Sequence, residues 1–434
     1  MSDCITGKGK SMEREISTVA KNGIKIYALK NPAVHGFSLS LFLLSGSMYE
    51  GEGESGITHF LEHIAIRNVN EVMGGELYRT LDRHGLEFNA SSFAEMVQFY
   101  VYGSSEKLAL GAQLLSRVIS PIILSTEEIE RERSRIKAEI REGDDRGSLS
   151  SFSNKIVYEG TSLAGTITGS VGSVNKITKK KLEEYRRRVF TSDNLFIYLV
   201  GSFTDADLST VAEVFDTELE NSSTQNRNIA PVPRKFGKRD GRVQVKNADY
   251  TMMRFSFDVD MERVGVRESD LLYEVLLGGN SSRFYIEMSE KKGLFYDVSG
   301  TIDRYRNIGS FVFSFEVRQD KIYEAAECVI DILKSIKKTL LAEDECMKAG
   351  YVDNVMLLCD DVRELGFTMA YDNKVMGLGY SSVDARAAAY DAVTPEQIRD
   401  AANEIFRPEN LTLTLKGNKR KIDTARLEGI ASNL

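Results

Sequence analysis

Two histidines and a glutamate within five residues are the side chains of this chain best suited to chemistry. The stretch reads His59-Phe60-Leu61-Glu62-His63. On a helix of about 3.6 residues per turn, residues four apart share one face, so His59 and His63 can bind one ion with Glu62 beside them. Zinc in catalytic sites takes three protein ligands and leaves a fourth position to water. The stretch therefore predicts a zinc-dependent peptide hydrolase with Glu62 as general base. The alternative is a helix that carries two histidines by coincidence.

The third ligand must come from another segment. The four cysteines lack C-x-x-C spacing, so an acidic residue is expected. Residues 126–143 have the start and stop signals of a helix, and Glu132 and Glu139 lie along its apolar stripe, two turns apart. Because a carboxylate away from water needs a partner, we expect Glu139 as ligand and Glu132 as its supporting acceptor. The alternative is a solvated, charge-rich helix. The stripe consists of Ile129, Ile136 and Ile140.

With these motifs the chain resembles the pitrilysin-type inverzincin metallopeptidases, in the branch of mitochondrial processing peptidase and related half-size bacterial peptidases. The segments that carry the resemblance are GSMYEGEGESGITHFLEH, GLEFNASSFAEMVQFY and RIKAEI. The resemblance implies zinc as cofactor and a peptide as substrate. It also implies a role for each residue of the motif: His59, His63 and Glu139 as zinc ligands, Glu62 as base and Glu132 as supporting carboxylate.

A strand signal over residues 85–102 indicates where a substrate binds. The small side chains of residues 89–92 leave room for another backbone to pair with the strand's edge. In the resembled family the equivalent strand holds the substrate as an extended peptide beside the zinc, which implies that Asn89 and Ala90 contact the substrate. Without the resemblance, an ordinary hairpin edge explains the segment equally well.

The chain also repeats itself. Residues 177–201 align without gaps with residues 393–417, at an offset close to half the length of 434 residues. The matched positions are those that a helix followed by a strand would fix. They include the pairs Thr178/Thr394, Leu182/Ile398, Phe190/Phe406 and Asn194/Asn410. This repeat predicts two copies of one domain.

We expect an N-terminal zinc-bearing domain at 1–220, a linker at 221–241 and an inactive C-terminal repeat at 242–434. Strands and helices that do not strictly alternate indicate an α+β class, with a mixed or antiparallel sheet and helices on one face. The resemblance implies two homologous αβ-roll domains that enclose a cavity. The expected strands are 25–28, 38–44, 99–102 and 196–200, and the expected helices are 106–119, 126–142, 179–189, 268–277, 321–341 and 383–402.

One segment of the second half departs from the resembled family. GGNSSRFYIEMSEKKGLFYDVSG matches a family segment in which an Arg and, seven residues later, a Tyr hold the substrate and stabilise the oxyanion. Tyr296 is present, but Ser289 occupies the Arg position. Serine cannot replace the charged guanidinium fork, although Lys291 or Lys292 could compensate in part. We therefore expect the zinc-bearing subunit of a heterodimer whose sister subunit supplies the Arg/Tyr pair. The alternative is a self-sufficient homodimer.

Composition narrows the functional class. The net charge of −8 is modest and mixed in sign, so we expect no nucleic-acid partner. No apolar run reaches the roughly 18 residues that span a bilayer. The scattered cysteines favour a reducing compartment, and we expect a cytoplasmic protein. Three functions remain: a processing endopeptidase for small precursor or leader peptides, an oligopeptide-degrading peptidase, and a non-catalytic scaffold. The intact metal motif disfavours the scaffold.

Overall fold

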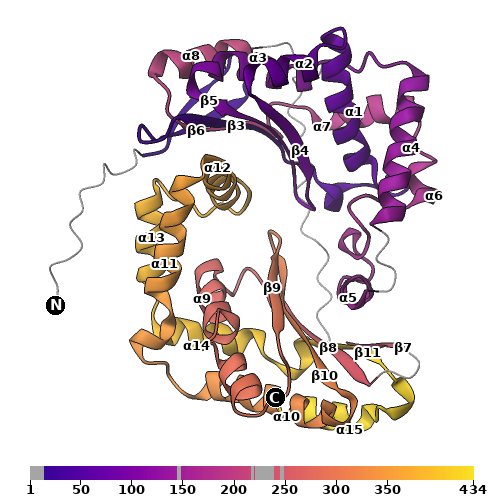
Figure 1. Ribbon diagram of the computed structural model, residues 1–434, viewed down its shortest axis with the longest axis vertical. Helices are drawn as coiled ribbons and strands as arrows, with labels where there is room; N and C mark the ends of the chain where they lie inside the picture. The colour runs from indigo at the N-terminus through magenta and orange to yellow at the C-terminus, as the bar shows by residue number, and fades with distance from the viewer. Residues whose placement is uncertain (1–13, 144–147, 217–218, 220–238, 245–248) are drawn as a thin grey trace, which may run out of the picture. The chain divides into compact units, whose positions relative to one another are not determined.

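The computed structural model describes residues 14–143, 148–216, 219, 239–244 and 249–434 (Figure 1). The chain divides into two compact units. Unit 1 comprises 1–144, 165–230 and 355–387, and unit 2 comprises 145–164, 231–354 and 388–434. Each unit thus includes one segment from the other half of the sequence. The expected continuous domains at 1–220 and 242–434 do not provide for these two segments. Of the expected linker, only residues 239–241 are described, and they form part of a strand; residues 221–238 lie outside the described residues.

Both units contain a mixed sheet and several helices, so the expected α+β class is confirmed. The elements of unit 1 are the strands β1 (Ile16–Val19), β2 (Lys25–Lys30), β3 (Gly36–Leu43), β4 (Glu87–Ser92), β5 (Val97–Ser104) and β6 (Leu195–Gly201) and the helices α1 (Ile57–Val72), α2 (Leu77–His84), α3 (Leu108–Ser116), α4 (Thr126–Glu142), α6 (Val171–Val174), α7 (Lys179–Val189), α8 (Asp205–Val214) and α12 (Val362–Ala370). Those of unit 2 are β7 (Arg239–Gln244), β8 (Tyr250–Asp260), β9 (Val298–Arg304), β10 (Ile308–Arg318), β11 (Leu411–Gly417), α5 (Leu149–Val157), α9 (Val266–Leu277), α10 (Ile322–Lys338), α14 (Pro395–Ile405) and α15 (Thr424–Ala431). The chain passes between the units within α11 (Lys348–Leu357) and α13 (Val383–Asp391).

The two sheets share one topology. The order is β1-β2-β6-β3-β5-β4 in unit 1 and β7-β11-β8-β10-β9 in unit 2. In unit 1, β2 is parallel to β6, and the next strand, β3, is antiparallel to β6. In unit 2, β7 is parallel to β11, and the next strand, β8, is antiparallel to β11. When β7 is matched to β2, each strand of unit 2 has a counterpart in unit 1. The outermost strand of unit 1 at this side is β4, which leaves one edge of β4 unpaired within the sheet.

The sequence repeat corresponds to α7–β6 in unit 1 and α14–β11 in unit 2. The hydroxyls of Thr178 and Thr394 accept bonds from the backbone N–H of the third helical residue. The side chains of Asn194 and Asn410 each donate to a carbonyl at the end of the preceding helix, at 3.1 Å. The matched threonines and asparagines thus make the same contacts in both units, because each unit needs the same helix cap and the same turn.

Each sheet is covered on both faces, and one cover comes from the other half of the sequence. In β6 the side chains of Ile197 and Leu199 belong to the core of unit 1, while α12 packs against β3 and β6. In unit 2, α5 packs against β7, β8 and β11 in the same manner. Burial on both faces explains why β6 reads as a continuous apolar run. The expectation of helices on one face only omitted these two segments.

Most expected elements form, with two differences. Residues 383–402 were expected as one helix, but the chain turns at residues 392–394 and restarts at Thr394, which caps α14 ahead of Pro395. A capping threonine followed by proline is a start signal that ends the preceding helix. The segment 85–102 forms the hairpin β4–β5, with its turn at residues 93–96.

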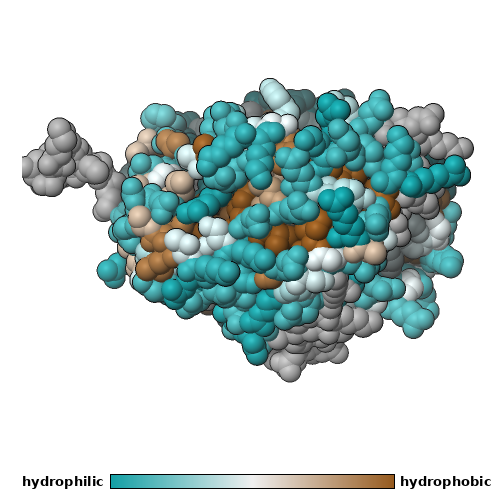
Figure 2. Space-filling model, turned by 90° about the horizontal axis from the view of Figure 1, so that it is seen from below, coloured by the Kyte–Doolittle hydropathy of each residue, from teal (hydrophilic) through white to brown (hydrophobic). Residues whose placement is uncertain are grey.

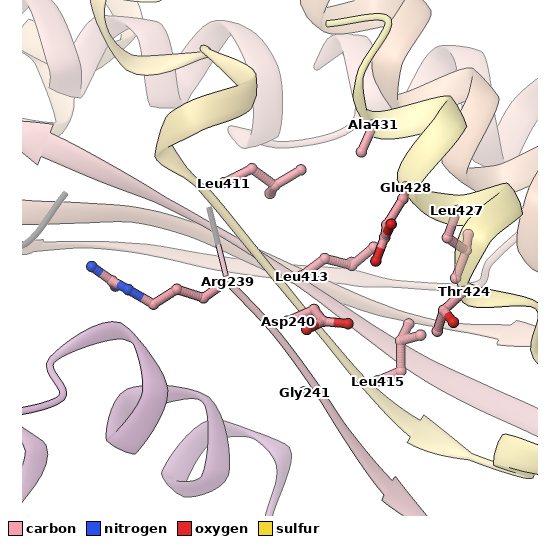
Figure 3. Close-up of a pocket in the computed structure, with 10 residues that line it drawn as sticks. All are labelled: Arg239, Asp240, Gly241, Leu411, Leu413, Leu415, Thr424, Leu427, Glu428 and Ala431. Carbon is pink, nitrogen blue, oxygen red and sulfur yellow. The ribbon is translucent and has the colours of Figure 1, made fainter. Parts of the chain in front are cut away.

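A small apolar cavity lies in unit 2 between α15 and β11. Its volume is about 30 Å³, enough for about one water molecule. Figure 3 shows the leucines of β11 facing Leu427 and Ala431 of α15, while Arg239 extends away from them. Apolar residues also form a band on the side of the molecule that carries α10 and α15 (Figure 2). We assign no chemistry to this cavity, because it is far too small for a peptide.

Candidate metal centre

Helix α1 presents the two histidines and Glu62 on the side away from its core face. Phe60 and Ile64 are fully buried in the core of unit 1, as the helical period requires. His59 and Glu62 are buried and His63 is half-buried. The rings of His59 and His63 lie 4.7 Å apart at 69°. The sequence pattern thus placed these side chains on one helix face, as expected.

Helix α4 brings the acidic residues to α1. Ser125 and Glu128 form a capping box at its start, and Ile129 and Ile136 are buried. Glu132, on the same side, is only 4% exposed, whereas the side chain of Glu139 remains 48% exposed. The expected stripe therefore forms, and it turns both carboxylates toward the histidines.

The three ligand atoms that the sequence singled out converge. Nε2 of His59 lies 3.3 Å from Oε1 of Glu139, and Nε2 of His63 lies 3.3 Å from its Oε2. A tetrahedral zinc ion with bonds of about 2.0–2.1 Å holds its ligand atoms about 3.4 Å apart. Two imidazole nitrogens and one carboxylate oxygen also form the donor set of a catalytic zinc site. The residues therefore fit zinc in chemistry, and one ligand atom from each lies within 4.8 Å of the other two.

The two histidines differ in their electrostatic environment. Burial, together with the positive charge of His63 when protonated, lowers the pKa of His59 to about 4. Burial also acts on His63, but the hydrogen bond of Glu132 and the charges of Glu62 and Glu139 outweigh it and raise the pKa of His63. A metal ligand must be unprotonated. His59 meets this condition at neutral pH by itself, whereas the raised pKa of His63 means that a proton competes more strongly with a cation there.

Glu132 lies behind His63, where a supporting carboxylate is needed. Its Oε2 is 3.9 Å from Nδ1 of His63, on the side of the ring opposite the converging Nε2 atoms. Its Oε1 accepts a hydrogen bond from Arg135 at 2.9 Å. A carboxylate in this position fixes the tautomer and orientation of a metal-binding ring. Glu132 thus lies beside the Nδ1 side of His63, away from the three converging ligand atoms.

Glu62 is held by Ser92, a contact that the sequence did not predict. The hydroxyl of Ser92 donates to Oε2 of Glu62 at 2.5 Å. Burial raises the pKa of Glu62, although the Ser92 hydrogen bond offsets part of this rise. A raised pKa makes a carboxylate a better proton acceptor. Ser92 lies in the small-residue segment of β4, but its pairing with Glu62 depends on how β4 packs over α1.

A second unpredicted contact fixes the start of α1. Gly56 caps the helix in a left-handed conformation with φ of 86° and offers no side chain. Instead, the carboxylate of Glu50 accepts from the backbone N–H groups of Gly56 and Thr58, both at 2.9 Å. The hydroxyl of Thr58 in turn lies 2.7 Å from that of the buried Tyr185. These contacts hold the helix turn directly before His59.

A cleft of about 590 Å³ in unit 1 is lined by the converging His59, His63 and Glu139 and by part of β4. Asn89 and Ala90, the expected substrate contacts, both line it. The backbone N–H of Ala90 donates to Oδ1 of Asn89 at 2.9 Å rather than to β5. Other residues of the lining that the sequence did not indicate are Ile66, Arg67, Tyr78, Arg135, Ile167 and Thr168.

The remaining residues that the sequence singled out lie in unit 2. Tyr296 is 96% exposed in the segment before β9. The hydroxyl of Ser289 donates to the carbonyl of Phe295 at 3.1 Å. Lys291 lies 2.7 Å from Glu287, and Lys292 is exposed. The contribution of Tyr296 to catalysis stays a prediction.

Two models of one protein family match most of the chain. The model described as "Insulinase (Peptidase family M16)" matches residues 25–170, and the model described as "Peptidase M16 inactive domain" matches residues 176–349. The converging His59, His63 and Glu139 all fall within the first match, and Tyr296 falls within the second. No described helix is both long enough and apolar enough to cross a membrane.

Similar proteins point the same way. An uncharacterized zinc protease of Rickettsia felis is 25% identical over 394 residues, which cover 89% of this chain and 90% of the relative. A protease of Helicobacter pylori has a similar structure, with a TM-score of 0.81 and 19% identity over 94% of this chain and 100% of that chain. The periplasmic protease PqqL of Escherichia coli has a TM-score of 0.80 and 17% identity over 97% of this chain, but over only 50% of PqqL.

Proposed function

The chain belongs to peptidase family M16 and is a zinc protease, and from this premise we propose that it is a zinc-dependent endopeptidase for extended peptides. We assign His59, His63 and Glu139 as zinc ligands and Glu62 as general base. The observation that carries the proposal is the convergence of the two Nε2 atoms on both oxygens of Glu139, each at 3.3 Å. Glu62 stands next to them with its carboxylate fixed by Ser92.

Each of these residues has a separate role in peptide hydrolysis. Zinc, when bound, acidifies water and polarises a carbonyl as a Lewis acid. Glu62 takes a proton from the attacking water and passes it to the leaving amine. Ser92 holds one oxygen of Glu62, and Glu62 lines the cleft. Glu132 keeps the His63 ring in orientation.

Strand β4 supplies the binding surface for the peptide. It lies at the edge of its sheet, and it lines the same cleft as the metal-binding residues. The N–H of Ala90, which now bonds to the side chain of Asn89, is a donor that an incoming strand can use. Pairing of this kind reads the backbone of a peptide, so it favours extended substrates of varied sequence.

We further propose that the chain is the zinc-bearing subunit of a heterodimer that processes small precursor or leader peptides. Ser289 at the position of the family's Arg supports this, because its hydroxyl already bonds to Phe295 and carries no charge. The match to half of PqqL supports it as well, since that protease contains twice the length of this chain. A homologous sister subunit would then provide the Arg/Tyr pair.

The second candidate is a self-sufficient homodimer that degrades oligopeptides. Tyr296 favours it, because this residue of the pair is present and fully exposed. Lysines at positions 291 and 292 could supply a charge near it, although Lys291 already pairs with Glu287. In this case purified protein needs no partner for full activity.

Replacement of Glu62 by Gln tests the proposed chemistry. We expect Glu62→Gln to keep one zinc per chain, measured by elemental analysis, and to lose about 10²–10⁴ in kcat on an unstructured peptide. Glu139→Gln should instead lose zinc. Glu52→Gln is the matched control, because Glu52 is exposed in the loop before α1. Unchanged turnover of Glu62→Gln would show that Glu62 is not the general base.

Full activity of the purified chain alone would contradict the heterodimer.

A further inference from the structure

We propose that a stripe on α12 and the turn after it positions the β4–β5 hairpin for substrate binding and catalysis. The stripe consists of Arg363, Phe367 and Tyr371, which are spaced by four residues. This inference rests on the proposed function of β4 as the substrate strand. The helix lies some 270 residues after the hairpin in the sequence, yet both belong to unit 1.

The first residue of the stripe holds the start of β4. Arg363 Nη1 lies 3.3 Å from Glu87, the first residue of the strand. Its guanidinium also lies over the ring of Tyr102, 4.9 Å from the centroid. Tyr100 donates to the same Glu87 from the neighbouring strand, at 3.1 Å. Arg363 therefore joins both strands of the hairpin at its open end.

The other two residues hold the turn. The ring of Phe367 packs on that of Phe93, with centroids 5.3 Å apart. The hydroxyl of Tyr371 donates to Oε2 of Glu95 at 2.9 Å, and Glu95 is only 4% exposed. A buried carboxylate with a directed donor fixes its backbone more firmly than an exposed ion pair. The turn is thus the more strongly held end.

The turn directly follows the residue that bonds to the proposed base. Ser92, which holds Glu62, immediately precedes Phe93. The carbonyls of Phe93 and Ala94 accept from the N–H groups of Ser47 and Met48, in the loop that leads to α1. A shift of the turn therefore moves both the hydroxyl on Glu62 and the loop before the metal-binding helix.

Helix α12 is itself fixed, so it can act as a support. Val362, Leu365 and Met369 are buried, and α12 packs on β3 and β6. Because residues three or four apart share one side of a helix, the buried residues form one face and the stripe residues form another. Glu364 lies on neither face and is exposed, so it provides a matched control on the same helix.

The first test measures anchoring without any substrate. We expect Tyr371→Phe and Phe367→Ala in the full-length protein to speed amide hydrogen exchange in residues 87–96, while exchange in β6 stays as in wild type. Glu364→Gln should exchange like wild type throughout. Tyr371→Phe removes only the hydroxyl, so it remains informative if Phe367→Ala does not fold. Unchanged exchange of the hairpin in the folded variants would overturn the proposal.

The second test separates positioning from general stability by kinetics on an unstructured peptide. Tyr371→Phe should lower kcat about tenfold with zinc content unchanged, because the Ser92–Glu62 contact is loosened. Arg363→Ala should raise KM by up to about fivefold at nearly constant kcat, and Arg363→Lys should restore part of this. Kinetic constants equal to those of Glu364→Gln would overturn the positioning role. A wild type that cleaves no peptide, either alone or together with its sister subunit, would contradict the proposed function, while hydrogen exchange would still decide whether the stripe holds the hairpin.

Discussion

Glu62 combines two opposing influences at a single residue. Burial raises its pKa, which favours proton uptake, and the hydrogen bond from Ser92 lowers it again. The bond also fixes the orientation of the carboxylate, since it occupies one of the two oxygens. Ser92 therefore sets both the basicity and the direction of the proposed base.

Removal of this hydroxyl should change the pH dependence of the reaction. We expect Ser92→Ala to lower kcat by about tenfold, in the range of a single lost catalytic hydrogen bond. The acid limb of the kcat/KM profile should move to higher pH, because the pKa of Glu62 rises when its donor is lost. Ser91→Ala is the control, since Ser91 lines the same cleft from the neighbouring position. An unshifted acid limb would show that Ser92 does not act on Glu62 in the active enzyme.

Residue types and spacing predicted which side chains share a helix face, while the meeting of the two helices at His59, His63 and Glu139 was expected from the need of a buried carboxylate for a partner and from the family resemblance. His59 and His63 share a face by their spacing of four, and Glu132 and Glu139 by their spacing of seven. Ser92 follows no such period relative to Glu62, because the two meet only when β4 packs over α1. Contacts across elements of this kind are set by the tertiary fold, which spacing along the chain does not describe.

At the scale of elements, the start of α1 depends on a buried acid. Glu50 replaces the side-chain cap that Gly56 cannot offer. Burial raises the pKa of Glu50 to about 7, from an ordinary value of 4.5, even though the bonds from Thr58 and Gly56 lower it. The folded protein therefore holds a proton at Glu50 more tightly than the unfolded chain does.

This raised pKa predicts a loss of stability as pH rises. The contribution of Glu50 is fully present below about pH 4.5 and is lost as the pH rises through its folded pKa of about 7. In metal-free protein, the free energy of unfolding of wild type relative to Glu50→Gln should fall by about 2 kcal/mol between pH 5 and 8. Denaturant unfolding of both proteins at each pH measures this difference. Parallel curves would contradict the assignment, and Glu52→Gln should track wild type.

Elements with strong local signals could be predicted from the sequence, and elements that depend on distant partners could not. Helix α4 begins at its capping box, and α7 ends at the predicted residue. The interval 383–402 was expected as one helix because its apolar period continues across Thr394, where the cap in fact starts α14. The role of α12 as a cover for β3 and β6 has no local signal, since it follows from burial against strands far away in sequence.

At the scale of the whole molecule, the strands of the two units follow a corresponding order, and each unit includes one segment from the other half of the sequence. We propose that the halves derive from one duplicated domain, as the shared caps and turns of α7–β6 and α14–β11 support. Unit 1 needs α12 from the second half to cover one face of its sheet, and unit 2 needs α5 from the first half. Neither half of the sequence therefore contains all the elements of one unit.

This exchange predicts how the chain behaves when it is cut. Residues 1–230 alone lack α12 and leave Val200 of β6, which lies against Gly366 of that helix, and other apolar side chains of the sheet uncovered, so this fragment should aggregate or fail to unfold cooperatively. Co-expressed with residues 231–434, it should copurify as a complex that binds one zinc, because each half then supplies the segment that the other lacks. Affinity purification through a tag on one half, followed by elemental analysis, measures both properties.

A charge placed in the exchanged helix should abolish this rescue. Leu365 is 1% exposed on the covering face of α12, and Leu365→Asp puts an unpaired carboxylate into that contact, at a cost of several kcal/mol. Copurification should then fail, whereas Glu364→Gln, at the exposed neighbouring position, should leave it intact. If residues 1–230 instead gave a monomer with a sharp thermal transition and wild-type zinc affinity, α12 would be dispensable for unit 1. In that case α12 would pack against unit 1 without being required for its folding, because the sheet of unit 1 would be stable with one face exposed.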